Sequence, residues 1–371
     1  MKKKLLFFIP NLKHGGAEKV LVNLVNNLNP EKYDITVHTI FDVGVHRSAL
    51  KPYIRYKSVF KREFRGNNRL FQLFPPEFLW KFMVKDTYDI AISYLEGPTN
   101  RIVSGCNVPG TKTVAWLHTG METQEVFFVG FRNSNEAARC YLKYDRVIAV
   151  SRRVKECFCT HLDKPRRVEV LYNTNETEQI REMANSPCED DRFAYDGLKV
   201  CTTGKLIPVK GFDRLLNAHK RLLDEGFRHH LYILGIGEEQ KALEQQMKRL
   251  GIADSVTLLG FQKNPYQYVS RCDLYVCSSR REGFSTAVTE ALILGTPVVS
   301  TDCSGAKELL GEQDEYGLVV ENSEEGVYQG MKKMLSDPAL LAHYRNKAKE
   351  RGSFFSRTET VRAVEEMLDN L

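Results

Sequence analysis

Short apolar runs alternate with amphipathic segments along the whole chain of 371 residues. The first run, 5–9, is followed by a segment from Ala17 to Leu28 whose apolar residues recur at helical spacing. Strands alternating with helices in this way are typical of parallel α/β sheets, so we predict an α/β fold. Strands are expected at 5–9, 35–40, 90–94, 113–117, 146–150 and 168–171 in the first half, and at 199–203, 231–234, 256–259, 274–277, 298–301 and 318–320 in the second half.

The chain is long enough for two hydrophobic cores of roughly 150–200 residues each. A polar, acidic segment at 173–196 separates the two series of strands and is the expected linker. We predict an N-terminal domain at 1–185, a second domain at 186–356, and an amphipathic C-terminal helix at 357–371. The apolar run at 5–9 is too short for a signal-peptide core, and no stretch approaches the length of a membrane span, which favours a cytoplasmic protein.

Two glutamates in a β-loop-α-β unit form the strongest chemical signal. Glu282 follows the strand at 274–277, and Glu290 lies in a helix that Ser285 can cap. Both therefore belong to the carboxyl edge of a parallel sheet, where ligands bind in open α/β folds. Carboxylates that accept hydrogen bonds from hydroxyls, beside helix amides that attract anions, suit a phosphorylated sugar. The alternative is that both are solvated glutamates at the start of a helix.

Other motifs also stand at strand ends. Gly15 and Gly16 open the first helix, where glycine allows a ligand to approach the backbone, although an ordinary strand-to-helix turn explains them equally well. Lys205 and Lys210 follow the strand at 199–203 and could neutralise a diphosphate, or lie in solvent as exposed lysines usually do. His118 follows the strand at 113–117, and a lone histidine is more often structural than catalytic.

The segment Leu234-Gly235-Ile236-Gly237 imitates a dinucleotide-binding motif but has Gln240 where the third glycine belongs. It also follows the second strand of its domain rather than the first, so a nicotinamide oxidoreductase is disfavoured. The two glycines are expected to shape a nucleotide pocket instead.

Taken together, these motifs resemble glycosyltransferase family 4, the retaining enzymes with two Rossmann-like domains known as the GT-B type. The Glu-x7-Glu motif is present as Glu282 and Glu290, and the shorter motifs occur in the family's order over most of the chain. The family more often has arginine where Lys205 stands, which weakens that assignment because lysine lacks a bidentate fork. The resemblance implies two parallel-sheet domains facing across a cleft, with the C-terminal helix crossing back to the first.

The resemblance also implies an activity: transfer of a hexose-type sugar from a nucleotide diphosphate sugar, with a UDP-sugar expected, to an acceptor hydroxyl. The first domain would take the acceptor and the second the donor. The residues implied in catalysis are His118, Lys205, Lys210 and Glu282. Those implied in donor binding are Gly15, Gly16, Gly204, Lys205, Lys210, Gly235, Gly237, Glu282, Gly283, Phe284, Ser285, Thr286, Ala287 and Glu290. Gly16 would contact the diphosphate, Glu282 the sugar and Glu290 the ribose.

No cofactor or metal is expected, because the sequence has no Asp-x-Asp motif and no cluster of histidine, cysteine and carboxylate at ligand spacing. None of the nine cysteines forms a Cys-x-x-Cys pair, so buried reduced thiols are expected. Two other functions remain open: a sugar-nucleotide epimerase on the same fold, and a sugar-nucleotide-binding protein without catalysis.

Charge is unevenly distributed: residues 1–180 carry 28 lysines and arginines against 18 acids, whereas the whole chain has a net charge of +6. The segment from Phe60 to Phe82 mixes aromatic rings with cations, including Lys61, Arg62, Arg65 and Arg69. It fits peripheral contact with an anionic membrane, at the inner face of the plasma membrane, or a core-facing helix with a basic outer side. The expected partners are the sugar donor and a glycan or lipid-linked acceptor of surface polysaccharide or glycolipid assembly, with no nucleic acid.

Overall fold

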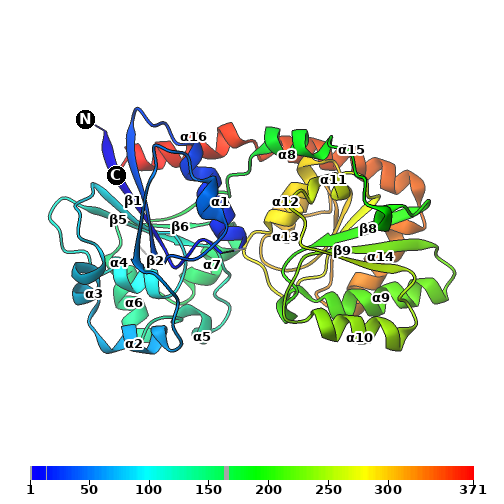
Figure 1. Cartoon of the computed structure of the whole chain (residues 1–371), viewed down its shortest axis with the longest axis horizontal. Helices are drawn as coiled ribbons and strands as arrows, with labels where there is room; N and C mark the ends of the chain where they lie inside the picture. The colour runs from blue at the N-terminus through cyan, green and yellow to red at the C-terminus, as the bar shows by residue number, and fades with distance from the viewer. Residues whose placement is uncertain (1, 14, 163–166) are drawn as a thin grey trace. The chain divides into compact units, whose positions relative to one another are not determined.

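The computed structural model describes residues 2–13, 15–162 and 167–371, and the chain divides into two compact units (Figure 1). The first unit comprises 1–175 together with 357–371, and the second comprises 176–356. Each unit is built on one parallel sheet covered by helices, which confirms the predicted fold class.

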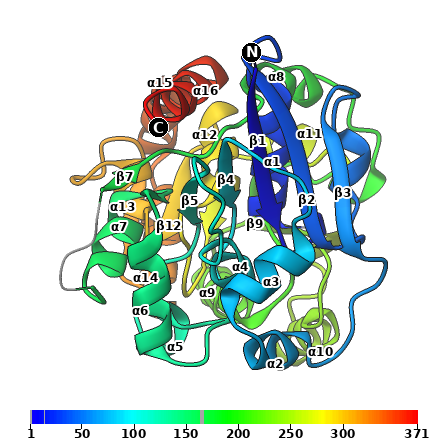
Figure 2. The same cartoon turned by 90° about the vertical axis from the view of Figure 1, so that its left-hand side faces the viewer.

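The first unit has a seven-stranded sheet in the order β3-β2-β1-β4-β5-β6-β7, and all described strand pairs are parallel (Figure 2). Its elements are β1 (Lys3–Ile9), α1 (Gly16–Asn27), β2 (Tyr33–Phe41), η1 (His46–Ala49), β3 (Arg55–Phe60), α2 (Asn67–Leu73), α3 (Pro76–Met83), β4 (Ile90–Ser93), α4 (Pro98–Val103), β5 (Lys112–Leu117), α5 (Gln124–Phe127), α6 (Ser134–Lys143), β6 (Arg146–Ala149), α7 (Arg152–Cys159), β7 (Val168–Val170) and α16 (Arg357–Asp369).

The second unit has a six-stranded parallel sheet in the order β10-β9-β8-β11-β12-β13. Its elements are α8 (Thr177–Ala184), η2 (Asp191–Phe193), β8 (Leu198–Thr203), η3 (Pro208–Lys210), α9 (Phe212–Asp224), β9 (His229–Leu234), α10 (Gln240–Leu250), β10 (Val256–Gly260), α11 (Tyr266–Val269), β11 (Leu274–Cys277), α12 (Thr286–Ile293), β12 (Val298–Thr301), α13 (Ala306–Leu310), β13 (Leu318–Val320), α14 (Glu324–Leu335) and α15 (Pro338–Phe354).

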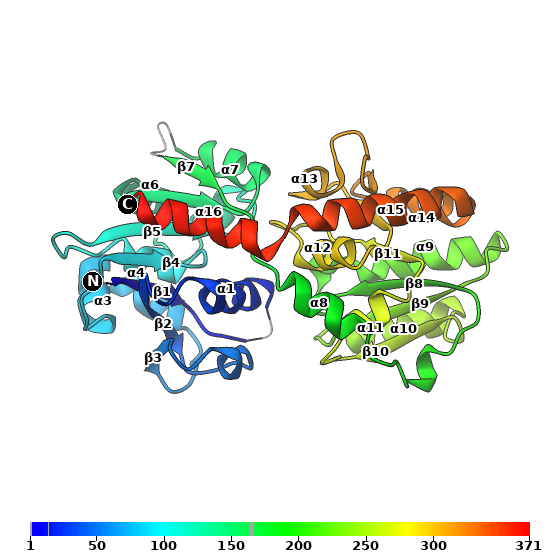
Figure 3. The ribbon, with the colours of Figure 1, turned by 90° about the horizontal axis from the view of Figure 1, so that it is seen from above.

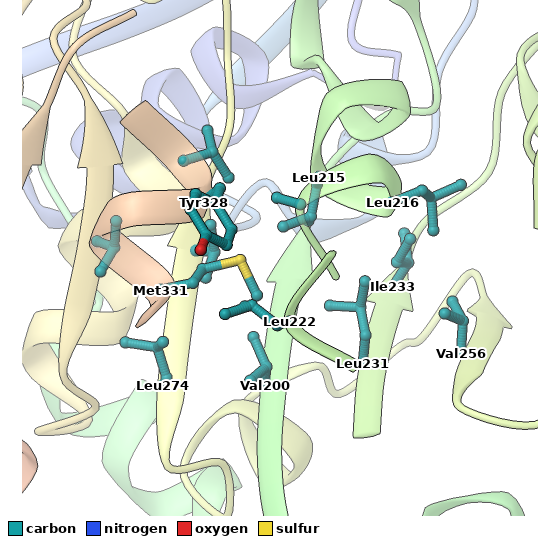
Figure 4. Packing of buried hydrophobic residues seen from close by; sticks show 14 of the residues in the cluster. Val200, Leu215, Leu216, Leu222, Leu231, Ile233, Val256, Leu274, Tyr328 and Met331 are labelled. Atoms are coloured by element: carbon teal, nitrogen blue, oxygen red, sulfur yellow. The ribbon is translucent and has the colours of Figure 1, made fainter. Parts of the chain in front are cut away.

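The core of the second unit lies between its sheet and the helices α9 and α14 (Figure 4). Leu215 and Leu222 of α9 and Met331 of α14 are fully buried against strand residues such as Val200 and Leu231. Central strands with apolar residues on both faces are expected when helices cover both sides of a parallel sheet. The central strands therefore appear in the sequence as continuous apolar runs, and for this reason their positions could be predicted.

The C-terminal helix α16 packs along the first unit (Figure 3). Its buried face includes Val364 and Leu368, and Asp369 accepts a hydrogen bond of 2.7 Å from the Tyr33 hydroxyl. Lys32 forms an ion pair of 3.1 Å with the same carboxylate. These contacts hold the end of the chain against β2.

The structure differs from the expected domain division at one helix. Helix α8 falls in the second unit, so the units divide between residues 175 and 176 rather than between 185 and 186. Ile180 and Ala184 of α8 are buried with Tyr266 and Ile293, and Asn264 donates a hydrogen bond of 2.8 Å to the Met183 carbonyl. The polar and acidic composition of this segment predicted a linker, although Ile180 and Ala184 within it form the apolar face of a helix.

Candidate functional site

The second sheet reverses its strand order between β8 and β11, because β9 and β10 lie on one side of β8 and β12 and β13 on the other side of β11. At such a switch point the loops leaving adjacent strands turn in opposite directions and leave room for a ligand. The loop after β8 carries Lys210 and the loop after β11 carries Glu282. The topology therefore brings two of the predicted residues to one place.

Lys210 and Glu282 form a shielded ion pair. The Lys210 Nζ lies 2.6 Å from the Glu282 Oε1, and the two side chains are 25% and 12% exposed. The Ser279 hydroxyl donates a second hydrogen bond of 2.6 Å to the same oxygen. Burial lowers the pKa of Lys210, but the adjacent carboxylate outweighs it, so the net pKa is raised and the ammonium keeps its charge at neutral pH.

The loops that carry this pair are locked together by backbone contacts. Gly211 has a φ of +65°, and a Cβ placed there would lie 2.2 Å from the Ser278 carbonyl oxygen, so only glycine permits this approach. Ser278 in turn donates a hydrogen bond of 3.0 Å to the Lys210 carbonyl, and Arg214 donates one of 2.7 Å to the Ser278 carbonyl. The ammonium and the carboxylate are thus held by a rigid frame.

Helix α12 begins beside the ion pair. Ser285 is its N-cap, as predicted: its hydroxyl accepts a hydrogen bond from the Val288 amide at 3.4 Å. Gly283 and Phe284 are buried, and the Phe284 ring packs edge-on against Phe355, so Phe284 can offer a ligand its backbone but not its ring. Thr286 and Ala287 form the first turn of α12, whose amides have no acceptor within the helix.

A small pocket joins these groups. Its lining includes Lys210, Glu282, Ser285 and Ala287 together with the ends of β8 and β11, and it also reaches Thr203. Glu290 lies outside that lining, one turn further along α12, and accepts a hydrogen bond of 3.3 Å from the Tyr266 hydroxyl. The two glutamates of the motif therefore have different partners in this unit.

The glycine pairs of the neighbouring loops have a packing role. A Cβ on Gly235, whose φ is +144°, would lie 1.8 Å from the Gly204 carbonyl oxygen, and one on Gly237 would lie 2.2 Å from the Leu206 oxygen. The glycines thus allow the loops after β8 and β9 to pack closely at the carboxyl edge. Lys205 in the first of these loops is exposed and lies outside the pocket lining, and its role in catalysis and donor binding stays a prediction.

In the first unit, His118 follows β5 and packs against the Tyr94 ring, with ring centroids 4.8 Å apart. Burial lowers the pKa of His118 to about 3, so its imidazole is neutral at physiological pH. Its Nε2 is buried without a hydrogen-bond partner among the described residues. A neutral imidazole with an unused nitrogen can accept or donate one hydrogen bond to a ligand.

Glu96 is a candidate residue that the sequence reasoning missed. It follows β4, and its carboxylate accepts hydrogen bonds from the backbone amides of both His118 and Thr119. Burial raises the pKa of Glu96 to about 7, although these amides and its own act to lower it. The signal in the sequence was a Glu-Gly pair directly after an apolar strand, the same arrangement as Glu282-Gly283.

Gly15 and Gly16 lie at the start of α1, with Gly15 as its extended N-cap. A Cβ on Gly15 would lie 2.0 Å from the Glu18 carboxylate, which folds back over the turn. Because that carboxylate ends a flexible side chain that can move aside, the contact alone does not require glycine at position 15, and the role in diphosphate binding stays a prediction for both glycines.

The first unit also has a hollow of about 330 Å³ lined by residues such as Lys112, Arg146 and Arg167. It lies where β5, β6 and β7 begin, at the amino ends of the strands, and Lys112 is paired with Asp145 at 3.2 Å. Ligands of open parallel sheets bind at the opposite edge, so we do not assign the site to this hollow.

Comparison with known families identifies the chain. The family model described as "Glycosyltransferase Family 4" matches residues 14–179, and the model described as "Glycosyl transferases group 1" matches residues 190–351. The protein is a family 4 glycosyltransferase of the GT-B type. The two models correspond to the two sheets in chain order, and the second contains Lys210, Glu282 and Glu290.

This glycosyltransferase is similar to bacterial enzymes over nearly its full length. It is 29% identical over 382 residues to the N-acetylgalactosamine-N,N'-diacetylbacillosaminyl-diphospho-undecaprenol 4-alpha-N-acetylgalactosaminyltransferase of Campylobacter jejuni, covering 97% of this chain and 98% of the relative. It is 23% identical to the amylovoran biosynthesis glycosyltransferase AmsD of Erwinia amylovora, covering 86% and 87%.

Among solved structures, the transferase resembles the Anabaena protein HepE in complex with UDP-glucose, with a TM-score of 0.82, 21% identity and full coverage of both chains. It also resembles a sucrose-phosphate synthase from Thermosynechococcus elongatus, with a TM-score of 0.79 and 14% identity, covering 100% of this chain and 99% of the other. At these identities the likeness shows the fold.

No helix among the described residues is long and apolar enough to cross a membrane. Within the same residues there is no group of three or more histidine, cysteine, aspartate and glutamate side chains able to hold a metal ion.

Proposed function

We propose that this glycosyltransferase moves a hexose-type sugar from a UDP-sugar to the hydroxyl of a glycan or lipid-linked acceptor, with retention of anomeric configuration. The observation that carries the donor assignment is the Lys210–Glu282 pair of 2.6 Å at the switch point of the second sheet, beside the start of α12. A cation, helix amides and a carboxylate at one edge match the parts of a sugar diphosphate.

Each group has a distinct task in this proposal. The Lys210 ammonium, held at 2.6 Å from the Glu282 carboxylate, lies against the diphosphate and stabilises its charge as the sugar bond breaks. Glu282 accepts hydrogen bonds from the sugar hydroxyls, and Glu290 accepts them from the ribose. Because Lys210 has three donors and gives one to Glu282, it can bind a phosphate oxygen without leaving the carboxylate.

Retention follows if the acceptor hydroxyl attacks on the face that the diphosphate leaves, with the departing phosphate taking the proton. The buried histidine supports this view, since a pKa of about 3 makes His118 a poor general base at neutral pH. His118 would instead offer its unpartnered Nε2 to the transferred sugar. The charge of Lys210 would replace a divalent ion, so transfer would need no metal.

The proposed acceptor class rests on the relatives. The Campylobacter jejuni enzyme is named for an undecaprenol-linked acceptor, and the Erwinia amylovora protein for amylovoran biosynthesis. We extend this to an acceptor of surface polysaccharide or glycolipid assembly, which would bring the protein to the inner face of the plasma membrane. The first unit, which carries His118 and Glu96, would take the acceptor.

Incubation with UDP-, GDP- and ADP-sugars and a polyprenyl diphosphate-linked sugar tests the proposal. We expect a UDP-sugar to be consumed only when the acceptor is present, to give an α-linked product from an α-linked donor, and to react equally in EDTA. Interconversion of sugar nucleotides without acceptor would indicate an epimerase. Binding of UDP-sugars without any product would indicate a binding protein. A β-linked product would contradict retention.

A further inference from the structure

A row of large apolar side chains projects into solvent from the outer side of the first unit. Leu73 ends α2, Phe74 follows it, and Phe78 and Phe82 lie on α3; these four side chains are 72%, 38%, 50% and 49% exposed. The ring centroids of Phe74 and Phe78 are 5.1 Å apart, and those of Phe78 and Phe82 are 6.3 Å apart, with nearly parallel planes. We call these four residues the α3 face. Contiguous apolar exposure of this kind marks an interaction surface.

The fold does not need these rings. On the opposite side of α3, the side chains of Leu79, Trp80 and Met83 are buried and already anchor the helix. Earlier rings of the segment, Phe60 and Phe64, belong to an aromatic cluster around Phe71, which is itself buried. The aromatic segment from Phe60 to Phe82 thus divides into a packed part and the exposed α3 face.

The α3 face rests on a rigid support. The buried Arg101 donates hydrogen bonds of 2.8 Å and 2.7 Å to the carbonyls of Phe71 and Phe74, and it is held by Glu136 at 2.9 Å. Arg132 binds the Leu73 carbonyl at 3.1 Å. These bonds fix the corner between α2 and α3, so the rings are presented in one arrangement and lose little conformational entropy on binding.

The charges around the α3 face are cationic. Arg65, Arg69, Lys81 and Lys85 are exposed, and in the described part of the chain none of them forms an ion pair. The nearby Glu77 is paired with Lys143 at 2.8 Å, which cancels its charge locally. Aromatic rings bordered by unpaired cations complement a lipid surface with anionic headgroups.

We propose that the α3 face docks this glycosyltransferase on an anionic lipid bilayer, with its rings at headgroup level and the neighbouring cations against lipid phosphates. The purpose of docking, access to a lipid-linked acceptor, rests on the proposed function. The docking itself does not depend on the proposed function, because it requires only the α3 face and a bilayer.

Co-sedimentation of the full chain with vesicles tests this surface. The vesicles contain phosphatidylcholine alone or mixed with phosphatidylglycerol, at low and high salt. We expect salt-sensitive binding to the anionic vesicles. The double variant Phe78→Ser/Phe82→Ser should bind about tenfold or more weakly, since each ring loses much of its apolar transfer energy. The variant Arg69→Gln/Lys81→Gln should lose the salt sensitivity.

Matched controls come from the second unit. Phe354→Ser removes a ring that is 55% exposed, and Lys248→Gln/Arg249→Gln removes two exposed cations of α10. Both should bind vesicles as the parent does. Circular dichroism checks the fold of every variant, and stabilisation by UDP in thermal unfolding checks the donor site separately.

Absence of parent binding to anionic vesicles, or equal binding by the parent and the double ring variant, would overturn the proposed surface. If light scattering instead finds a dimer that the ring variant abolishes while vesicle binding persists, the α3 face is a contact between two copies. Loss of vesicle binding with intact UDP stabilisation leaves the donor site unaffected. Vesicle binding without any UDP stabilisation supports docking and counts against the proposed donor.

Discussion

The two glutamates of the Glu-x7-Glu motif have different neighbours, and their substitution should therefore have different effects. Glu290→Ala removes a carboxylate proposed to bind ribose, and we expect about a ten- to hundredfold loss of UDP affinity in calorimetric titration. Glu282→Ala frees the Lys210 ammonium from its partner at 2.6 Å, so UDP binding should persist while transfer fails. Equal losses of UDP affinity in both variants would contradict this division.

Lys210→Ala should lower transfer severely, because it removes the charge proposed to face the leaving diphosphate and leaves Glu282 without its cation. Lys205→Ala, at an exposed position in the same loop and outside the pocket lining, should have the smaller effect of the two. Steady-state kinetics with a UDP-sugar separates turnover from KM. A fully active Lys210→Ala variant would exclude the proposed role.

The buried carboxyl group of Glu96 should make the stability of the protein depend on pH. Its pKa rises from the ordinary 4.5 to about 7 because of burial, so between these values the folded protein holds a proton that the unfolded chain has lost. The contribution of Glu96 to stability must then fall as pH rises through this window and level off above it. Glu96→Gln does not titrate and imitates the protonated form, so its stability relative to the parent should grow to roughly 3 kcal/mol above neutrality.

Denaturant unfolding of the parent and Glu96→Gln at several pH values measures this difference. Glu156→Gln, which changes an exposed glutamate of α7, is the control and should show no such trend. A constant difference between Glu96→Gln and the parent at every pH would show that Glu96 does not titrate in this window. The sequence could not predict this residue's environment, because its burial arises only where the ends of β4 and β5 meet.

At the scale of elements, the sequence predicted the central strands of both sheets and missed β3. The central strands are buried on both faces and appear as apolar runs, whereas the edge strand Arg55–Phe60 is half-buried and carries Arg55 and Lys57. The helix cap at Ser285 was also readable, because capping depends on residues that are neighbours in sequence. The close approach of the loops that carry Gly211 and Ser278 could not be predicted, because these residues are far apart in the sequence.

Gly211 offers a test of that loop packing with a matched control. Gly211 and Gly251 both have a φ of +65°, so alanine at either position carries the same backbone strain of about 1–2 kcal/mol. At Gly251 the new Cβ meets nothing within 4 Å, but at Gly211 it lies 2.2 Å from the Ser278 carbonyl oxygen. We expect Gly211→Ala to be the less stable variant in thermal unfolding and to bind UDP more weakly. Equal behaviour of the two variants would show that the loops can separate without consequence.

At the scale of the whole molecule, the chain forms two similar sheets but divides its chemistry between them. The second unit contains a fixed cation, a carboxylate and a helix start, which suit a diphosphate donor. The first unit contains a neutral histidine and a carboxyl group with a pKa near 7, which suit hydroxyl groups better than phosphate. The sequence indicated the candidate site of the second unit clearly, because Glu282 and Glu290 lie close together along the chain. Of these two groups in the first unit it indicated only His118.

Buried neutral histidines in both units should make the whole protein sensitive to acid. Burial and neighbouring histidines lower the pKa of His219 to about 2, and burial lowers those of His229 and His38 to about 4. The unfolded chain takes up protons below about pH 6.5, whereas these folded side chains do not, so stability is present above that pH and is lost as the pH falls. Each such histidine lowers the unfolding free energy by up to about 1.4 kcal/mol per pH unit between roughly 6.5 and its folded pKa.

Denaturant unfolding between neutral and mildly acidic pH measures that slope. His219→Gln removes one titrating group from the pair in which the His219 Nδ1 lies 2.8 Å from the His229 Nε2, so the slope for the second unit should become shallower even if the variant is less stable overall. His343→Gln, at an exposed position on α15, should leave the slope unchanged. If His219→Gln keeps the parent's slope, the pair already accepts a proton in the folded state, with the charge shared across the hydrogen bond, and acid lability must come from elsewhere in the chain.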